Sequence, residues 1–113
     1  MIVIAGTMQI HPDDREAMLE AFGPIQAATR ADEPGCLAYA FSADPLSADG
    51  VLIYEHWADA DALDAHFRHP NFANARAVLG GFRRLGAAMK KYRIDAMADI
   101  YIDGKPSTAF PSE

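Results

Sequence analysis

The 113-residue sequence predicts an α+β domain in which two helical regions cover one face of a four-stranded antiparallel sheet. Apolar residues recur at every second position in four stretches, which is typical of strands with one buried face. Between the first two and the last two of these stretches, apolar residues recur at helical spacing instead. Clusters of Gly, Pro, Asp and Ser separate the stretches and mark turns. The predicted order of elements is therefore β-α-β-β-α-β.

The N-terminal quarter predicts one strand followed by one long helix. Residues 1–10 are largely apolar and β-branched, and one face of this strand is expected to be buried. Asp13 and Glu16 have the spacing of a capping box, which predicts a helix over residues 13–31. Pro24 interrupts this helix, and because proline lacks a backbone N–H, we expect a kink there. The strand positions expected to face inward are Ile2, Ile4, Met8 and Ile10.

The middle of the chain predicts a turn and then a hairpin. Pro34–Gly35 is typical of a turn in which proline presets φ and glycine takes a positive φ. Strands are predicted over residues 36–43 and 51–57, joined by a loop over 44–50 that is rich in Asp, Pro, Ser and Gly. The first of these strands is expected to point Leu37, Tyr39 and Phe41 toward one face.

The C-terminal half predicts a broken helical region and a last strand. A helix begins near Ala58, and Pro70 interrupts it, because the residue before proline avoids helical geometry. A second helical piece is expected to continue to about Met89, with Phe72, Val78, Leu79, Phe82 and Leu85 facing inward. Long alternation predicts the last strand over residues 91–102. We expect a single domain over residues 1–104 and a tail over 105–113.

The predicted order is the ferredoxin-like arrangement, and it leaves one sheet face without helices. The strands nevertheless carry apolar or small residues on both sides, so the uncovered face needs a partner. The simplest solution is a twofold homodimer with the two sheets face to face, a dimeric α+β barrel.

Composition excludes several classes of function. The net charge of −6 and the absence of a long basic run argue against nucleic acid as a partner. No apolar run is long enough for a membrane span, and no signal peptide is visible, so a cytoplasmic protein without a membrane partner is expected. The lone Cys36 cannot form a disulfide within the chain.

Four stretches in the middle of the chain form a set of motifs in a characteristic order: Ala31–Tyr39, Tyr54–Trp57, Ala62–Phe67 and Pro70–Phe72. In order and spacing they resemble the antibiotic-biosynthesis monooxygenase family, which includes quinol monooxygenases. The resemblance covers roughly residues 1–88 and implies the same β-α-β-β-α-β order and the same dimer. It also implies, for characterised members, oxidation of hydroxylated aromatics to quinones by O2 without metal or flavin. Haem-degrading relatives carry other residues at the positions of His66, Arg76 and Gly6 in this chain. This difference argues against haem as a cofactor.

An oxygenase without a cofactor must make its substrate the electron donor, because ground-state oxygen reacts slowly with closed-shell molecules. Deprotonating a phenol increases its reducing power, so such a site needs a base with a pKa near neutral and a dry aromatic pocket. His66 is the candidate base, since unperturbed histidine titrates near pH 6.5. The full set of candidates comprises His66, Trp57 and Tyr39 as catalytic residues and Asn71, Phe67, Phe72, Glu55 and Phe22 as substrate-binding residues.

Each candidate also has a purely structural interpretation. His66 could be a core histidine bonded to a carbonyl group or to Glu55, and Trp57 and Tyr39 could simply fill the core. Asn71 could be an ordinary helix-start residue. Glu55, an acid in an apolar strand, is expected to pair with His66 or with an arginine, because an isolated buried carboxylate is costly.

Two other functions fit the same residues. The first is a non-catalytic dimeric module that binds a small ligand, and the second is a polyketide isomerase or cyclase that uses His66 without consuming oxygen. A metal site is disfavoured, because His56, His66 and His69 do not follow a zinc-binding pattern.

Overall fold

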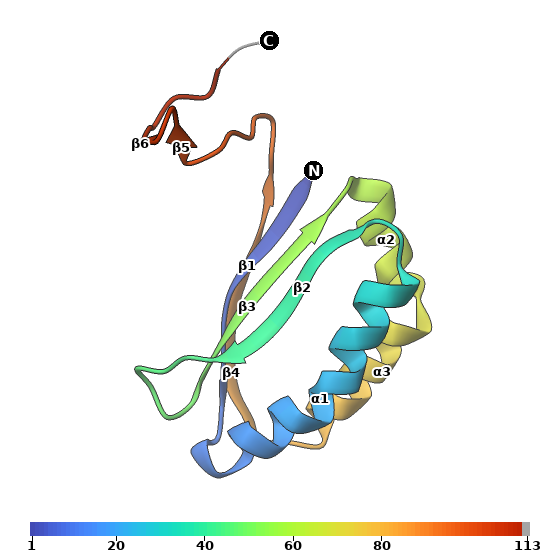
Figure 1. The fold of residues 1–113 in the computed structure, drawn as a ribbon. Helices are drawn as coiled ribbons and strands as arrows, with labels where there is room; N and C mark the ends of the chain where they lie inside the picture. The colour runs from blue at the N-terminus through green and yellow to red at the C-terminus, as the bar shows by residue number, and fades with distance from the viewer. Residues whose placement is uncertain (112–113) are drawn as a thin grey trace.

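The computed structural model describes residues 1–111 and confirms the α+β fold and its β-α-β-β-α-β core (Figure 1). The elements are β1 (Ile2–Ile10), α1 (Pro12–Asp32), β2 (Cys36–Ala43), β3 (Gly50–Trp57), α2 (Ala60–Arg68), α3 (Pro70–Gly80), β4 (Arg84–Arg93), β5 (Tyr101–Ile102) and β6 (Lys105–Pro106). Antiparallel strands in the order β2-β3-β1-β4 form the main sheet. The second helical region is broken before Pro70, as predicted, and gives α2 and α3.

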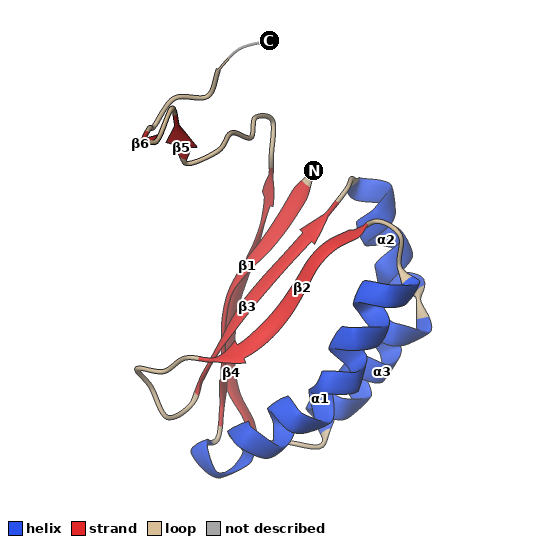
Figure 2. Ribbon diagram, viewed as in Figure 1, coloured by secondary structure: helices blue, strands red, loops and turns tan. Residues whose placement is uncertain are grey.

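The three helices lie on one face of the main sheet (Figure 2). The alternation in β1 and β3 predicts this layer correctly, since Met8, Ile10, Val51 and Ile53 point toward the helices and are buried. They pack with Met18 and Phe22 of α1 in one core cluster. No helix within residues 1–111 has the length and apolar character needed to cross a membrane.

Helix α1 begins one residue earlier than predicted and uses a different cap. His11 is the N-cap, and its Nδ1 accepts a hydrogen bond from the backbone N–H of Asp13 at 3.1 Å. Pro12 occupies the first turn, where a missing N–H costs nothing. The capping box predicted at Asp13 and Glu16 is therefore wrong. The helix continues through Pro24 as one element.

The start of β2 departs from simple alternation. The pairing register with β3 shifts between Cys36 and Ala38, so Cys36 packs against the core while Leu37 is 54% exposed. The prediction that Leu37 shares a face with Tyr39 and Phe41 is therefore wrong, since the latter two are buried. The preceding Gly35 has no positive φ, contrary to expectation. It is required by close packing instead, since a Cβ there would lie 2.3 Å from the Cβ of Ala62.

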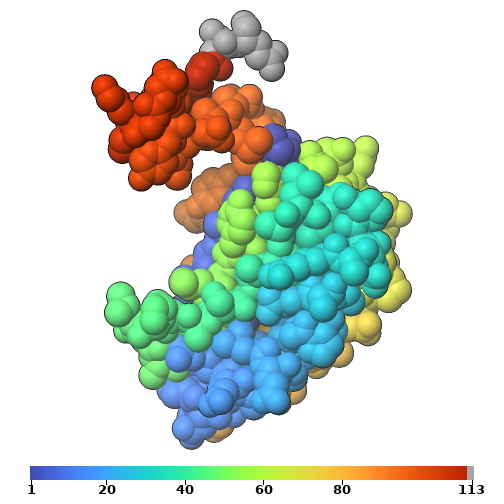
Figure 3. Space-filling model, in the orientation of Figure 1, coloured from blue at the N-terminus to red at the C-terminus, as the bar shows by residue number. Residues whose placement is uncertain are grey.

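The last strand lies earlier in the chain than the sequence predicts. Helix α3 ends at Gly80, and β4 over Arg84–Arg93 pairs with β1 along nearly its whole length, so the predicted helix to Met89 and strand over 91–102 are wrong. Leu85 consequently lies 60% exposed rather than inward. The alternating residues 94–102 pair with no strand of the main sheet. Only the small β5–β6 hairpin forms there, on a segment that projects from the end of the sheet (Figure 3).

The close approach of β1 and β4 depends on Gly6. Its φ is +156°, and a Cβ there would lie 2.0 Å from the carbonyl oxygen of Ala88. Any side chain at this position would push the two strands apart, which explains the glycine in an otherwise β-branched strand.

Thr29 of α1 carries an unpaired polar group in the core. The residue is fully buried, and its hydroxyl has no hydrogen-bond partner among the described residues. Because an unsatisfied buried hydroxyl costs about 1–3 kcal/mol, Thr29→Val should increase the free energy of unfolding by about 1 kcal/mol in urea denaturation. Thr29→Ser keeps the hydroxyl and loses the methyl group, so it should be less stable than the parent. A Thr29→Val variant no more stable than the parent would show that the hydroxyl is satisfied in solution.

Candidate active site

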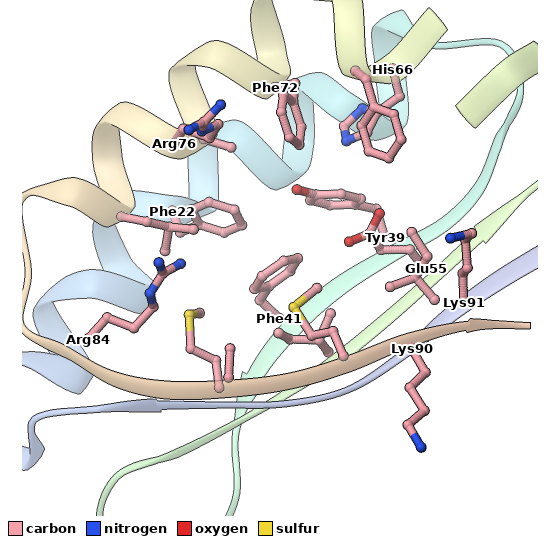
Figure 4. Close-up of a pocket in the computed structure, with 18 residues that line it drawn as sticks. Phe22, Tyr39, Phe41, Glu55, His66, Phe72, Arg76, Arg84, Lys90 and Lys91 are labelled. Carbon is pink, nitrogen blue, oxygen red and sulfur yellow. The ribbon is translucent and has the colours of Figure 1, made fainter. Parts of the chain in front are cut away.

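A cavity of about 500 Å³ lies between the helices and the sheet, and every helix and all four strands of the main sheet contribute to its wall (Figure 4). Aromatic and apolar side chains make up most of that wall, as is usual for small-molecule sites. The residues that matter most for the argument below are Phe22, Tyr39, Phe41, Glu55, His66 and Phe72.

His66 is held on the cavity wall by a buried carboxylate. Helix α2, capped by the Asp59 side chain on the Ala62 N–H, turns His66 inward until it is only 2% exposed. Its Nδ1 lies 2.8 Å from Oε1 of Glu33, the C-cap residue of α1. A carboxylate can only accept a hydrogen bond, so Nδ1 donates to Glu33, and Nε2 makes no hydrogen bond with another described residue.

Glu33 is itself fixed by a second donor. Its other oxygen, Oε2, accepts a hydrogen bond from Nδ2 of Asn71 at 3.1 Å. Glu33 and Asn71 are both buried, so the carboxylate is shielded from water and satisfied on both oxygens. The partners of His66 suggested by the sequence, a carbonyl group or Glu55, are wrong. The partner is Glu33, at the end of the preceding helix.

Aromatic rings surround the His66 imidazole. The ring centroid of Trp57 lies 4.4 Å away, that of Phe72 5.3 Å away and that of Tyr39 5.7 Å away. Trp57 is fully buried, and it supports the imidazole from within the core rather than bordering the cavity. Its ring fixes the plane of His66, which the hydrogen bond to Glu33 alone would leave free to rotate.

Glu55 on β3 is a second ionisable group on the cavity wall. It is 5% exposed, and burial raises its pKa to about 7, an effect that a hydrogen bond from the Trp57 Nε1–H at 3.1 Å partly offsets. The predicted pairing of Glu55 with His66 or an arginine is wrong, since its partner is Trp57. Burial, followed by the negative charge of Glu55, raises the pKa of the Tyr39 hydroxyl, so this group remains a hydrogen-bond donor at neutral pH.

A sequence model of one protein family matches residues 1–78, described as antibiotic biosynthesis monooxygenase. The chain belongs to this family. The match covers more than half of the chain and includes helix α1 with its C-cap Glu33, strand β3 with Glu55 and helix α2 with His66.

Several known proteins are similar to this family member. An uncharacterised protein of Synechocystis sp. is 35% identical over 71 residues, which are 63% of this chain and 48% of that protein. The chain thus matches about half the length of this curated relative. Two crystal structures whose names place them in the antibiotic biosynthesis monooxygenase family are also similar. The one from Deinococcus radiodurans has a TM-score of 0.78 at 26% identity, covering 89% of this chain and 99% of that one. The one from Caulobacter crescentus has a TM-score of 0.75 at 25% identity, covering 86% and 90%.

Within this member of the monooxygenase family, the structure brings together most of the residues selected from the sequence. The cavity is lined by His66, Tyr39, Glu55, Phe22, Phe67 and Phe72. Trp57 and Asn71 do not border it. Trp57 contacts two residues on its wall, Glu55 and His66, and Asn71 contacts Glu33, the partner of His66.

The other histidines lie elsewhere. His69 caps α3, and His56 lies on the opposite face of β3, where its Nε2 is 3.3 Å from Sδ of Met1. No group of three or more His, Cys, Asp or Glu side chains within residues 1–111 is arranged to hold a metal ion.

Sequence reasoning missed two features of the site. Glu33 directly precedes the Pro34–Gly35 turn, and the sequence presents it as a turn residue; only the packing of α1 against α2 and α3 shows its role. The basic residues of β4 were missed because the last strand was predicted seven residues too late. Its correct position places Arg84 and Lys91 on the cavity wall.

Proposed function

We propose that this protein is a monooxygenase that oxidises a hydroxylated aromatic with O2, using neither metal nor flavin, and that His66 is its general base. Family membership supports the reaction class. The observation that carries the proposal is the buried His66–Glu33 pair on the wall of an aromatic cavity. In its neutral form, the imidazole of such a pair has one free nitrogen in a dry site, as proton abstraction from a phenol requires.

The reaction begins with transfer of the phenolic proton to Nε2 of His66. The imidazolium that forms is stabilised by the Glu33 carboxylate at 2.8 Å on the other ring nitrogen. The phenolate then reduces O2, and oxygen adds to the ring carbon para to the hydroxyl. Loss of water from the resulting peroxide gives the quinone. One phenol with a para C–H and one O2 thus yield one quinone and one water, with no external reductant.

Tyr39 and Glu55 are proposed to orient the substrate. The protonated Tyr39 hydroxyl makes no hydrogen bond with another described residue, so it is free to donate to the substrate oxygen. Glu55, with its pKa raised by burial to about 7, is available to accept a proton from a second hydroxyl group of a polyhydroxylated substrate. Phe22, Phe67 and Phe72 provide stacking surfaces for the aromatic ring.

We further propose a homodimer built on the sheet face opposite the helices. Dimerisation is characteristic of this fold, and the face carries the exposed Leu52, Tyr54 and Tyr92. Leu52 and Tyr54 belong to β3 and Tyr92 belongs to β4, the two strands that flank β1 in the sheet. Sedimentation equilibrium should give twice the chain mass, and a monomer at micromolar concentration would contradict the proposal.

Oxygen uptake by metal-stripped protein tests the function. With naphthols that carry hydrogen para to the hydroxyl as substrates, uptake should persist in the presence of a chelator, with one O2 consumed per quinone formed. The absence of uptake with every compound, in protein shown to be folded, would contradict the proposed oxygenase. Ligand binding without turnover would then indicate a binding module, and product formation without oxygen consumption would indicate an isomerase or cyclase.

A further inference from the structure

Basic residues gather around the cavity although the protein as a whole is acidic. Of the ten lysines and arginines, four border the cavity, whereas Glu55 is the only acidic residue among those that line it. The four are Arg76 on α3 and Arg84, Lys90 and Lys91 on β4, and of these the Lys90 side chain points away from the cavity (Figure 4). With a formal net charge of −6, the chain has no general excess of positive charge that would produce this grouping.

Two of these basic residues stand together at one end of the cavity. Figure 4 shows Arg76 and Arg84 on the same side, opposite His66 and Glu55. Both arginines also border a second, adjoining pocket of about 410 Å³ that reaches the end of α3 at Gly80. Arg76 lies over the ring of Phe72, with its Cζ 6.0 Å from the ring centroid, which places its positive charge next to the aromatic wall.

Neither arginine is neutralised by the protein. Within residues 1–111, Arg76 and Arg84 form no ion pair, whereas Arg83 pairs with Asp14 and Arg68 pairs with Asp64. Both arginines are exposed, so an anion can reach their guanidinium groups from solvent. Guanidinium groups bind carboxylates in a bidentate manner, with strong and directional hydrogen bonds.

The cavity therefore has two chemically different ends. The end near His66 and Glu55 can exchange protons, and the end near Arg76 and Arg84 can bind an anion. Phe22 and Phe41 lie between them in Figure 4 and are suited to an aromatic ring. A substrate that satisfies both ends carries its hydroxyl and its negative charge on opposite sides of a ring system.

We infer that the substrate is a hydroxylated aromatic acid, bound with its carboxylate on Arg84 and Arg76 and its hydroxyl at His66. This inference rests on the proposed function and specifies its substrate class. A carboxylate at the arginine end also fixes which ring carbon faces the oxygen-reactive end. The two arginines would then determine both affinity and the position of oxidation.

Anaerobic calorimetry with three matched probes tests this inference without turnover. The probes are 5-hydroxy-2-naphthoate, its neutral amide and 1-naphthol, which share one ring system and differ in charge. The parent protein should bind the carboxylate at least about tenfold more tightly than the amide, because only the carboxylate forms charge-assisted hydrogen bonds. Arg84→Gln should remove this preference, and Arg84→Lys should retain part of it.

Arg68→Gln is the matched control. It makes the same chemical change on α2, at an exposed arginine that pairs with Asp64 and does not border the cavity. It should keep the preference for the carboxylate unchanged. Equal affinities for carboxylate and amide in the parent protein, no binding of any probe, or a preference that survives in Arg84→Gln would each overturn the inference.

Oxygen uptake with the same probes separates this inference from the proposed function. Oxidation of 1-naphthol without any preference for the carboxylate would leave the oxygenase intact and refute the anion site. A preference for the carboxylate that disappears in Arg84→Gln, without oxygen uptake, would support the anion site and refute the oxygenase.

Discussion

His66→Ala should lower kcat for oxygen uptake by at least about a hundredfold, the usual contribution of a positioned general base. Without the imidazole, no group bonded to Glu33 can take the phenolic proton, and Glu33 itself lies behind the position that the ring occupied. The affinity for the substrate should change much less, because the aromatic wall and Tyr39 remain. Initial rates measured with an oxygen electrode, together with calorimetric binding, separate the two effects.

The control for this variant is His11→Ala. It removes a histidine that caps α1 and does not border the cavity, so it should reduce stability without a comparable loss of kcat. If His66→Ala folds normally and consumes oxygen at the parent rate, His66 is not the base. Glu55 would then be the next candidate, since it lies on the cavity wall and burial raises its pKa to about 7.

Glu55→Gln should stabilise the protein at pH 8 by up to about 3 kcal/mol and have little effect near pH 4. Burial raises the pKa of Glu55 from 4.5 to about 7, so the folded protein holds a proton that the unfolded chain has already lost in this interval. The free energy of unfolding therefore falls as the pH rises from about 4.5 to about 7, and the deficit stays constant above that. Glutamine resembles the protonated acid and can still accept the Trp57 hydrogen bond, so the variant avoids this loss.

Urea denaturation of parent and variant at several pH values measures this difference directly. The same substitution at Glu20, on the exposed side of α1, serves as the matched control. Parallel curves for the parent and Glu55→Gln across pH 4–8 would show that Glu55 titrates in the folded protein as it does in the unfolded chain.

The sequence predicts those parts of the fold that local periodicity determines. Alternation in β1 and β3 and helical spacing in α1 and α2 give elements whose ends agree with the structure within about two residues. The last strand shows the limit of this approach. Residues 94–102 alternate between apolar and polar side chains, but β1 pairs with residues 84–93 instead. Alternation describes a possible strand, and pairing decides which possibility forms.

The residues of the site also differ in whether the sequence reveals them. His66 and Glu55 could be selected because a polar residue on an apolar face stands out in the sequence. Glu33 could not, since its partners His66 and Asn71 lie 33 and 38 residues away and are reached only when three helices pack. The bulge that replaces Leu37 with Cys36 in the core is also invisible, because a single extra residue leaves the composition of the strand unchanged.

The contact between Trp57 and His66 also gives the protein a built-in optical probe. Trp57 is the only tryptophan in the chain, so all indole emission originates beside the His66 imidazole, with ring centroids 4.4 Å apart. A protonated imidazole quenches an indole in contact with it, whereas a neutral one does so weakly. The intrinsic fluorescence of Trp57 therefore reports on its two ionisable neighbours, the His66 imidazole and the Glu55 carboxyl group that accepts its Nε1–H hydrogen bond, without any label in the cavity.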